Sequence, residues 1–270
     1  MFFYELFGFS FILFVTFKYR HPVQYYAKFT FYILTASAAS AILPYVGLFR
    51  YPIRDYRNGM LPAWSFRMIV QLLGLEYEVR GLENVDKNEG GVVVVAPHQS
   101  ILDLSVDAYL WPLIGRPIGV TKNIVLYVFP FGIGMWICGS LFIDRKNRQN
   151  AVKQLHAQTE AIQSRRNKIV IFPEGTRAQQ NKIMPFKKGA FHLAIDSQSM
   201  IQPVVVSNYH FLSSAEKRFQ KGKIIISILP AMSCKGMTKD DVNIVLERTK
   251  RLMDIDFEKI SNETKPQFHS

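Results

Sequence analysis

A histidine and an aspartate five positions apart, His98 and Asp103, are the first candidates for chemistry in this chain of 270 residues. The ordinary pKa of histidine, about 6.5, lets its imidazole take a proton from a hydroxyl near neutral pH. A carboxylate bonded to the other ring nitrogen would fix the tautomer and stabilise the imidazolium. Five positions along one ideal helix would turn the two side chains roughly 140° apart. The pair can therefore meet only if His98 lies in a turn and Asp103 in the first turn of a helix.

The same residues also support a purely structural interpretation. The segment from Ser100 to Asp103 has the spacing of a helix capping box, with Asp in place of the usual Glu or Gln. On residue types alone, both catalysis and capping stay open.

A second polar group follows further along the chain, in the sequence Glu174-Gly175-Thr176-Arg177. Glycine lets a backbone approach a ligand closely, and the planar guanidinium of arginine suits a phosphate or a carboxylate. A local salt bridge between Glu174 and Arg177 is the structural alternative. The pattern by itself indicates an anion-binding turn or such an ion pair.

Two short apolar runs must position these groups. Residues 91–95 and 168–172 are rich in Val and Ile and end directly before the two polar groups, which is typical of buried strands in a parallel sheet. The carboxyl ends of such strands open on the same edge, where α/β proteins bind ligands. Residues 149–166 keep helical spacing and are expected to form an amphipathic crossover helix. The prediction is an α/β fold with a mainly parallel central sheet flanked by helices.

Together, the two polar groups resemble the sequence motifs of a known enzyme family. The segment His98-Gln-Ser-Ile-Leu-Asp103 resembles the H-x(4)-D box of the glycerolipid acyltransferases, and Phe172-Pro-Glu-Gly-Thr-Arg177 resembles their E-G-T-R box. Residues 139–145, 182–192 and 201–207 resemble further family segments in the same order, so the resemblance spans roughly residues 64–255. The branch that it resembles most is the 1-acylglycerol-3-phosphate acyltransferases. Pro97 departs from that branch, which usually has Asn before the histidine.

The resemblance implies transfer of an acyl group from acyl-CoA to the sn-2 hydroxyl of 1-acyl-sn-glycerol-3-phosphate (lysophosphatidic acid), giving phosphatidic acid in phospholipid biosynthesis. His98 would be the general base and Asp103 would orient its ring. The thioester of acyl-CoA is already activated, so we expect no metal and no cofactor beyond this co-substrate. The implied substrate-binding residues are Lys122, Arg145, Glu174, Gly175, Thr176 and Arg177. The structural alternatives are a solvated side chain for Lys122 and an ordinary ion pair of Arg145 with Asp144.

Other functions remain compatible with these residues. The same chemistry could act on glycerol-3-phosphate or on a lysophospholipid with a larger headgroup. A lipid thioesterase or hydrolase could use His98 and Asp103 to activate water, and a non-catalytic membrane scaffold could keep the fold. Ser100 lacks the G-x-S-x-G pattern of a serine nucleophile, which favours direct transfer.

Composition indicates an anionic partner at a membrane. The formal net charge is +12 and 49% of the residues are hydrophobic, which suits an acidic surface. No zinc-finger, RNP or basic-zipper pattern points to nucleic acid, and no pattern indicates a particular protein partner. Residues 1–17, interrupted by Glu5, and residues 29–49 are apolar runs, expected to form a membrane-embedded helical pair. The expected location is the endoplasmic reticulum membrane, with the active site at its cytosolic interface.

A third uncharged run covers residues 124–143. We predict a buried hairpin or an acyl-chain groove there, with plain core packing as the alternative. A membrane span is rejected because it would place His98 and Arg177 on opposite sides of the bilayer. The expected organisation is a membrane anchor at residues 1–58, an acyltransferase domain at residues 59–260 and a flexible tail at residues 261–270.

Overall fold

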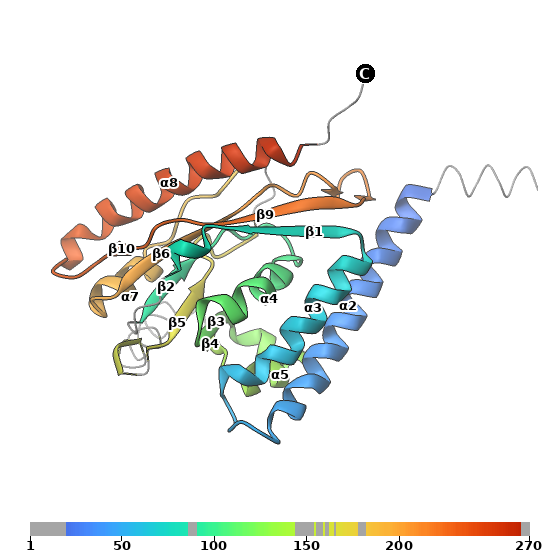
Figure 1. Cartoon of the computed structure of the whole chain (residues 1–270), viewed down its shortest axis with the longest axis horizontal. Coiled ribbons are helices and arrows are strands. Elements are labelled where there is room, and N and C mark those ends of the chain that lie inside the picture. Colours follow the sequence, from blue (N-terminus) through green and yellow to red (C-terminus); the bar gives the residue numbers. More distant parts are fainter. Residues whose placement is uncertain are drawn as a thin grey trace, which may run out of the picture.

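A mixed eight-stranded sheet forms the centre of the molecule (Figure 1). The computed structural model describes residues 20–85, 91–143, 166–177 and 182–265, together with 154, 159 and 162–164. All strand pairs along the sheet are parallel except β6 with β9, and β10 adds a second antiparallel pair with β6. The prediction of a mainly parallel sheet is confirmed. In spatial order the strands are β1 (Leu75–Arg80), β9 (Gly222–Ile228), β6 (Met200–Val206), β2 (Val92–Val95), β5 (Lys168–Ile171), β3 (Pro117–Lys122) and β4 (Leu141–Ile143), with β10 (Met232–Ser233) beside β6.

Strand β2 lies in the interior of the sheet, paired with β5 on one side and β6 on the other. Its four valines alternate between two hydrophobic cores: Val92 and Val94 enter one, and Val93 and Val95 enter the other. None of them is more than 1% exposed. Because side chains alternate across a strand, a run without any polar residue requires a packed layer on each face.

Helices supply those two layers (Figure 1). One face carries α2, α3 and α4, with α5 packed on α2, and the other carries α7 and α8. The predicted crossover helix at residues 149–166 lies mostly outside the described residues. Helix α8 continues three residues beyond residue 260, the predicted end of the enzyme domain. The helix bounds are α2 (Arg20–Gly47), α3 (Met60–Leu72), α4 (Asp103–Ile114), α5 (Phe131–Ile137), α7 (Gly189–Asp196) and α8 (Val242–Glu263).

Short elements complete the chain. In the described part of the chain, four 3-10 turns connect the main elements, and a two-stranded hairpin follows β6. They are η1 (Tyr56–Gly59), η2 (Leu82–Asn84), η3 (Asn123–Tyr127), η4 (Lys239–Asp241), β7 (Leu212–Ser213) and β8 (Arg218–Phe219).

Helix α2 is long and apolar enough to cross a membrane, judged by length and composition over Pro22–Gly47. Only 28% of its most apolar window is buried against the protein, although a core helix or a signal sequence can pass the same test. The helix begins at Arg20, well before the predicted run at residues 29–49, and the predicted first helix of the pair lies outside the described residues. On its inner face the Tyr32 hydroxyl donates a hydrogen bond to the carbonyl of Ile101, 3.2 Å away. This helix therefore contacts the loop that precedes α4.

The uncharged run at residues 124–143 forms neither a span nor a hairpin. It contains η3, the helix α5 and the edge strand β4, so the prediction of a buried hairpin is wrong. Pro130 stands at the start of α5, where a missing N–H costs little, and this favours a helix over a second strand. Burial is also incomplete, since the side chains of Ile124 and Phe129 are 66% and 78% exposed. An acyl-chain groove in this region stays a prediction.

Candidate active site

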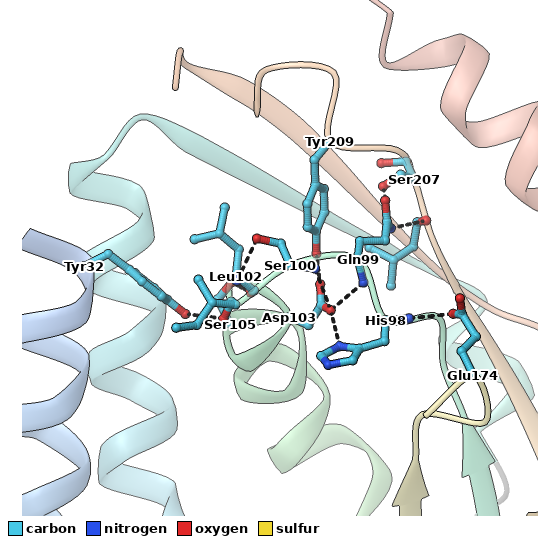
Figure 2. Close-up of polar contacts among 12 residues, drawn as sticks. Tyr32, His98, Gln99, Ser100, Leu102, Asp103, Ser105, Glu174, Ser207 and Tyr209 are labelled. Atoms are coloured by element: carbon cyan, nitrogen blue, oxygen red, sulfur yellow. Dashed lines mark hydrogen bonds and ion pairs between the residues drawn. The ribbon is translucent and has the colours of Figure 1, made fainter. Parts of the chain in front are cut away.

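His98 and Asp103 are in direct contact. The chain leaves β2, turns through His98, and enters α4 at Asp103, which is the arrangement that their spacing requires. The Nδ1 atom of His98 lies 2.7 Å from Oδ2 of Asp103 (Figure 2). Because an ionised carboxylate only accepts hydrogen bonds, Nδ1 carries the proton and Nε2 keeps a lone pair. The imidazole is thus held in the tautomer that a general base needs.

The Asp103 carboxylate accepts several hydrogen bonds at once. Oδ2 receives the backbone N–H of Gln99 at 2.7 Å and that of Ser100 at 3.0 Å, as well as the imidazole. Oδ1 receives the hydroxyl of Tyr209 at 2.8 Å. The structure places the N-cap of α4 at Leu102, without a side-chain capping bond, so the capping-box interpretation of Ser100 and Asp103 is wrong. The Asp103 carboxylate instead holds the turn that carries His98.

The ring of His98 also has an aromatic neighbour. It stacks on Phe172, with the ring centroids 4.5 Å apart and an angle of 23° between the planes. The His98 side chain is 23% exposed, whereas that of Asp103 is 5% exposed. The pair of His98 and Asp103, called the dyad below, thus combines a buried acceptor with a ring that solvent or substrate can reach.

Glu174 joins the two predicted loops through the backbone. Its Oε1 accepts the N–H of His98 at 2.8 Å, and its Oε2 accepts the N–H of Met184 at 2.9 Å. The residue is 3% exposed. Burial raises the pKa of this carboxyl above its ordinary value, and the two N–H bonds oppose that rise. The geometry gives Glu174 the task of fixing the backbone of His98, a contact that sequence spacing could not specify.

The turn after Glu174 presents the remaining residues of the motif. Gly175 has a φ of +74°, a left-handed conformation that favours glycine, and an added Cβ there would lie 2.7 Å from Nζ of Lys187. Thr176 and Arg177 are exposed. The turn that carries Arg177 follows β5, which pairs in parallel with β2, so it leaves the sheet at the same edge as the loop that carries His98.

Two further cationic residues, Lys122 and Arg145, were expected to contact the substrate. Lys122 is exposed at the end of β3, a strand that pairs with β5, and its register partner on β4 is Ile143. This places Lys122 on the same edge as the turn that carries Arg177. Arg145 follows β4 but lies outside the described residues. Within the described ranges, no group of three or more His, Cys, Asp or Glu side chains is arranged to hold a metal ion.

Two neighbours of the dyad were not predicted from the sequence. Tyr209 and Gln99 connect the His98 loop to the chain just after β6, and the Gln99 amide donates to the carbonyls of Val206 and Ser207 at 3.0 and 3.1 Å (Figure 2). Their only signal in the sequence is position, since β6 pairs in parallel with β2 and ends at the same sheet edge. A polar side chain directly after such a strand is a candidate for the same site.

A half-buried acid, Asp107, lies one helical turn beyond Asp103. Asp107 lines a cleft of about 110 Å³ between α2, α3, α4 and α5, together with apolar side chains such as Phe66 and Trp111. Its Oδ1 atom is buried and has no hydrogen-bond partner in the described part of the chain. Burial, with added repulsion from Asp103, raises the pKa of Asp107 to about 8. This side chain is therefore largely protonated at neutral pH.

The sequence of this chain is similar to those of known acyltransferases. Residues 76–207 match the family model described as Acyltransferase. Human 1-acyl-sn-glycerol-3-phosphate acyltransferase alpha is 33% identical over 211 residues, covering 78% of this chain and 74% of that protein. Human 1-acyl-sn-glycerol-3-phosphate acyltransferase beta is 32% identical over 239 residues, covering 88% and 85%. The chain belongs to the acyltransferase family.

Its relatives within that family also include the 1-acyl-sn-glycerol-3-phosphate acyltransferase of Saccharomyces cerevisiae, 35% identical over 191 residues, or 70% of this chain and 62% of that one. The fold resembles the crystal structure of the 1-acyl-sn-glycerophosphate (LPA) acyltransferase PlsC from Thermotoga maritima. That comparison has a TM-score of 0.67 at 16% sequence identity, and covers 89% of this chain and 97% of the other. The expected family and fold are confirmed.

Proposed function

We propose that this protein transfers an acyl group from acyl-CoA to the sn-2 hydroxyl of 1-acyl-sn-glycerol-3-phosphate, giving phosphatidic acid. The observation that carries the proposal is the contact between His98 and Asp103 at the carboxyl edge of the sheet, in a chain whose relatives bear the name of that reaction. Membrane association is supported by the apolar helix α2. We further propose the endoplasmic reticulum membrane as the location, with the site facing the cytosol.

The chemistry needs one base and no covalent enzyme intermediate. Nε2 of His98 takes the proton of the acceptor hydroxyl while the hydroxyl oxygen attacks the thioester carbonyl. The tetrahedral intermediate then collapses, the C–S bond breaks, and the protonated His98 gives its proton to the CoA thiolate. Asp103 stabilises the imidazolium between these two steps.

Positive side chains at the same edge suit the acceptor phosphate. Arg177 offers a planar fork and Lys122 a point charge, and Arg145 is the third cationic residue proposed for this role. The Glu174–Gly175–Thr176 turn shapes the approach to them. A phosphate held there would set the distance from the headgroup to His98.

The acceptor is tested with a panel of candidates and labelled acyl-CoA on purified protein. We expect acylation of lysophosphatidic acid to exceed that of glycerol-3-phosphate and lysophosphatidylcholine. A higher rate with either of the other acceptors would reassign the substrate. Release of free thiol without any acceptor would indicate a hydrolase, and no turnover with any acceptor would indicate a scaffold.

The base is tested with His98→Ala, which should lower kcat by about 10²–10⁴-fold, the usual contribution of a general base. Thermal unfolding of the variant is measured in parallel, so that a folding defect is recognised. More than a tenth of the wild-type activity in a folded variant would exclude the general-base role.

Phosphate binding is tested with Arg177→Ala, which should raise the KM for lysophosphatidic acid at least tenfold. Arg251→Ala on α8 is the matched control, because Arg251 is also exposed but belongs to the helix on the opposite face of the sheet. An equal KM in the two variants would place the phosphate contact elsewhere.

A further inference from the structure

Tyr209 reaches the catalytic dyad from a distant part of the chain. It follows β6, the strand next to β2, and is separated from Asp103 by 106 positions. Its hydroxyl donates a hydrogen bond of 2.8 Å to Oδ1 of Asp103, and both residues are buried. Figure 2 shows the phenol pointing at the carboxylate from the side opposite the imidazole.

The two carboxylate oxygens have different partners. Oδ2 accepts bonds from the imidazole and from two backbone N–H groups, all of them within the chain segment His98–Asp103. Oδ1 accepts the hydroxyl of Tyr209. The three bonds to Oδ2 restrain rotation about Cβ–Cγ from one side, and the bond to Oδ1 restrains it from the other. A buried charge also needs such donors to offset its desolvation.

The backbone that carries Tyr209 is itself anchored. The N–H of Asn208 donates to Oγ of Ser261 on α8 at 2.9 Å, and Ser207 exchanges two hydrogen bonds of 2.9 Å with Ile225 on β9. The Tyr209 ring lies 5.5 Å from that of Phe211, centroid to centroid. The hydroxyl is thus presented to Asp103 by a backbone segment that is hydrogen-bonded to α8 and to β9.

Tyr209 remains a donor over the whole working range of pH. Burial, followed by the negative charge of Asp103, raises the pKa of this phenol well above its ordinary value. Within the described residues, the titratable side chains that interact with Asp103 by hydrogen bond or charge are His98, Tyr32 on α2, Tyr77 on β1, Asp107 on α4, Glu174 after β5 and Tyr209 itself, and the charge of Arg177 acts on Tyr32.

We propose that Tyr209 is a positioning residue of the acyl transfer, which acts on His98 through Asp103 and does not touch the substrate. Its hydroxyl bonds to the second carboxylate oxygen and so stabilises the orientation in which Oδ2 accepts the hydrogen bond from Nδ1–H. It also shares the negative charge of the carboxylate, which sets how strongly the imidazolium is held. The proposal rests on the proposed function, because it assigns a role in a reaction that uses His98 as base.

The experiment compares Tyr209→Phe with Tyr77→Phe. Each change removes one hydrogen-bonded phenol hydroxyl, but that of Tyr77 bonds to Ser105 rather than to Asp103. A hydrogen bond to a charged group changes an equilibrium by about 10- to 100-fold. We therefore expect kcat to fall at least tenfold in Tyr209→Phe, with the KM for lysophosphatidic acid within twofold of wild type, and no comparable loss in Tyr77→Phe.

The pH profile separates positioning from a loss of stability. Without the bond to Oδ1, more negative charge remains on Oδ2 and the imidazolium is held more tightly. The acidic limb of the kcat/KM profile should therefore move to higher pH in Tyr209→Phe and stay in place in Tyr77→Phe. A fall in activity with no movement of the limb, or an equal fall in both variants, would overturn the proposal.

A readout without turnover keeps this test independent of the acceptor. NMR of the protein labelled in its histidine rings, with His98→Gln for assignment, follows the Nδ1 proton of His98 in detergent micelles. We expect this resonance to shift in Tyr209→Phe and to be unchanged in Tyr77→Phe, and an unchanged resonance in both would refute the proposal. If the wild-type protein acylated no lysophosphatidic acid, the proposed function would fail while the NMR comparison still tested Tyr209.

Discussion

Asp107, a half-buried acid whose Oδ1 atom is fully buried, predicts a specific dependence of stability on pH. Replacing it by Asn keeps the shape of the side chain and removes the titration. The pKa of Asp107 is about 8 in the folded protein, against an ordinary value of 3.8. Between these two values the unfolded chain releases a proton that the folded chain keeps. The wild-type protein therefore loses stability as the pH rises through this window, and the loss is complete only above the folded pKa.

The size of the effect follows from that window. Each pH unit inside it changes the free energy of unfolding by about 1.4 kcal/mol for one proton. From pH 5.5 to pH 7.5, the wild-type protein should lose about 3 kcal/mol relative to Asp107→Asn. For a domain of this size, such a loss corresponds to roughly 6–12 °C in Tm.

The assay is thermal unfolding of the two proteins in detergent at several pH values. The Tm of Asp107→Asn minus that of wild type should grow steadily from pH 5.5 to pH 7.5. Asp240→Asn, at an exposed position in η4, is the matched control and should give a constant difference. A constant difference for Asp107→Asn as well would mean that its carboxyl is ionised in the folded protein, and would refute the reasoning.

Two further predictions concern the frame around the site. Glu174→Gln should lower kcat at least tenfold. The glutamine amide has only one acceptor oxygen, so it cannot accept the N–H groups of both His98 and Met184, as the Glu174 carboxylate does. A kcat equal to that of the wild type would contradict this role of Glu174. Gly134→Ala should lower the Tm, since the new Cβ would overlap the carbonyl oxygen of Ser40 on α2. Gly119→Ala is its control, with the nearest atom 3.8 Å away, and equal Tm values in these two variants would contradict close packing of α5 on α2.

The sequence predicted the central strands because their composition leaves few alternatives. The valines of β2 and the apolar run of β5 suit a strand that is buried on both faces. The meeting of His98 with Asp103 was predictable for a similar reason. Their spacing excludes a shared helix, and the turn before α4 is the arrangement that remains.

Other features depend on contacts that no local pattern encodes. Tyr209 is one of 12 tyrosines, and only the pairing of β6 with β2 brings it to Asp103. The run at residues 124–143 was misjudged because a lack of charge is shared by buried strands, grooves and exposed apolar turns. Pro130 held the information that a helix begins there, but its effect depends on the packing of α5 against α2.

The position of β2 has a consequence for how activity is lost. An interior strand with packed layers on both faces belongs to the part of a protein that opens last, so its amide protons should exchange only on global unfolding. His98 stands three residues after the end of that strand, and its own N–H is tied to Glu174. Partial melting of peripheral helices should therefore leave the imidazole in place. Mild heating should weaken binding of the lipid substrate before it inactivates His98 as a base.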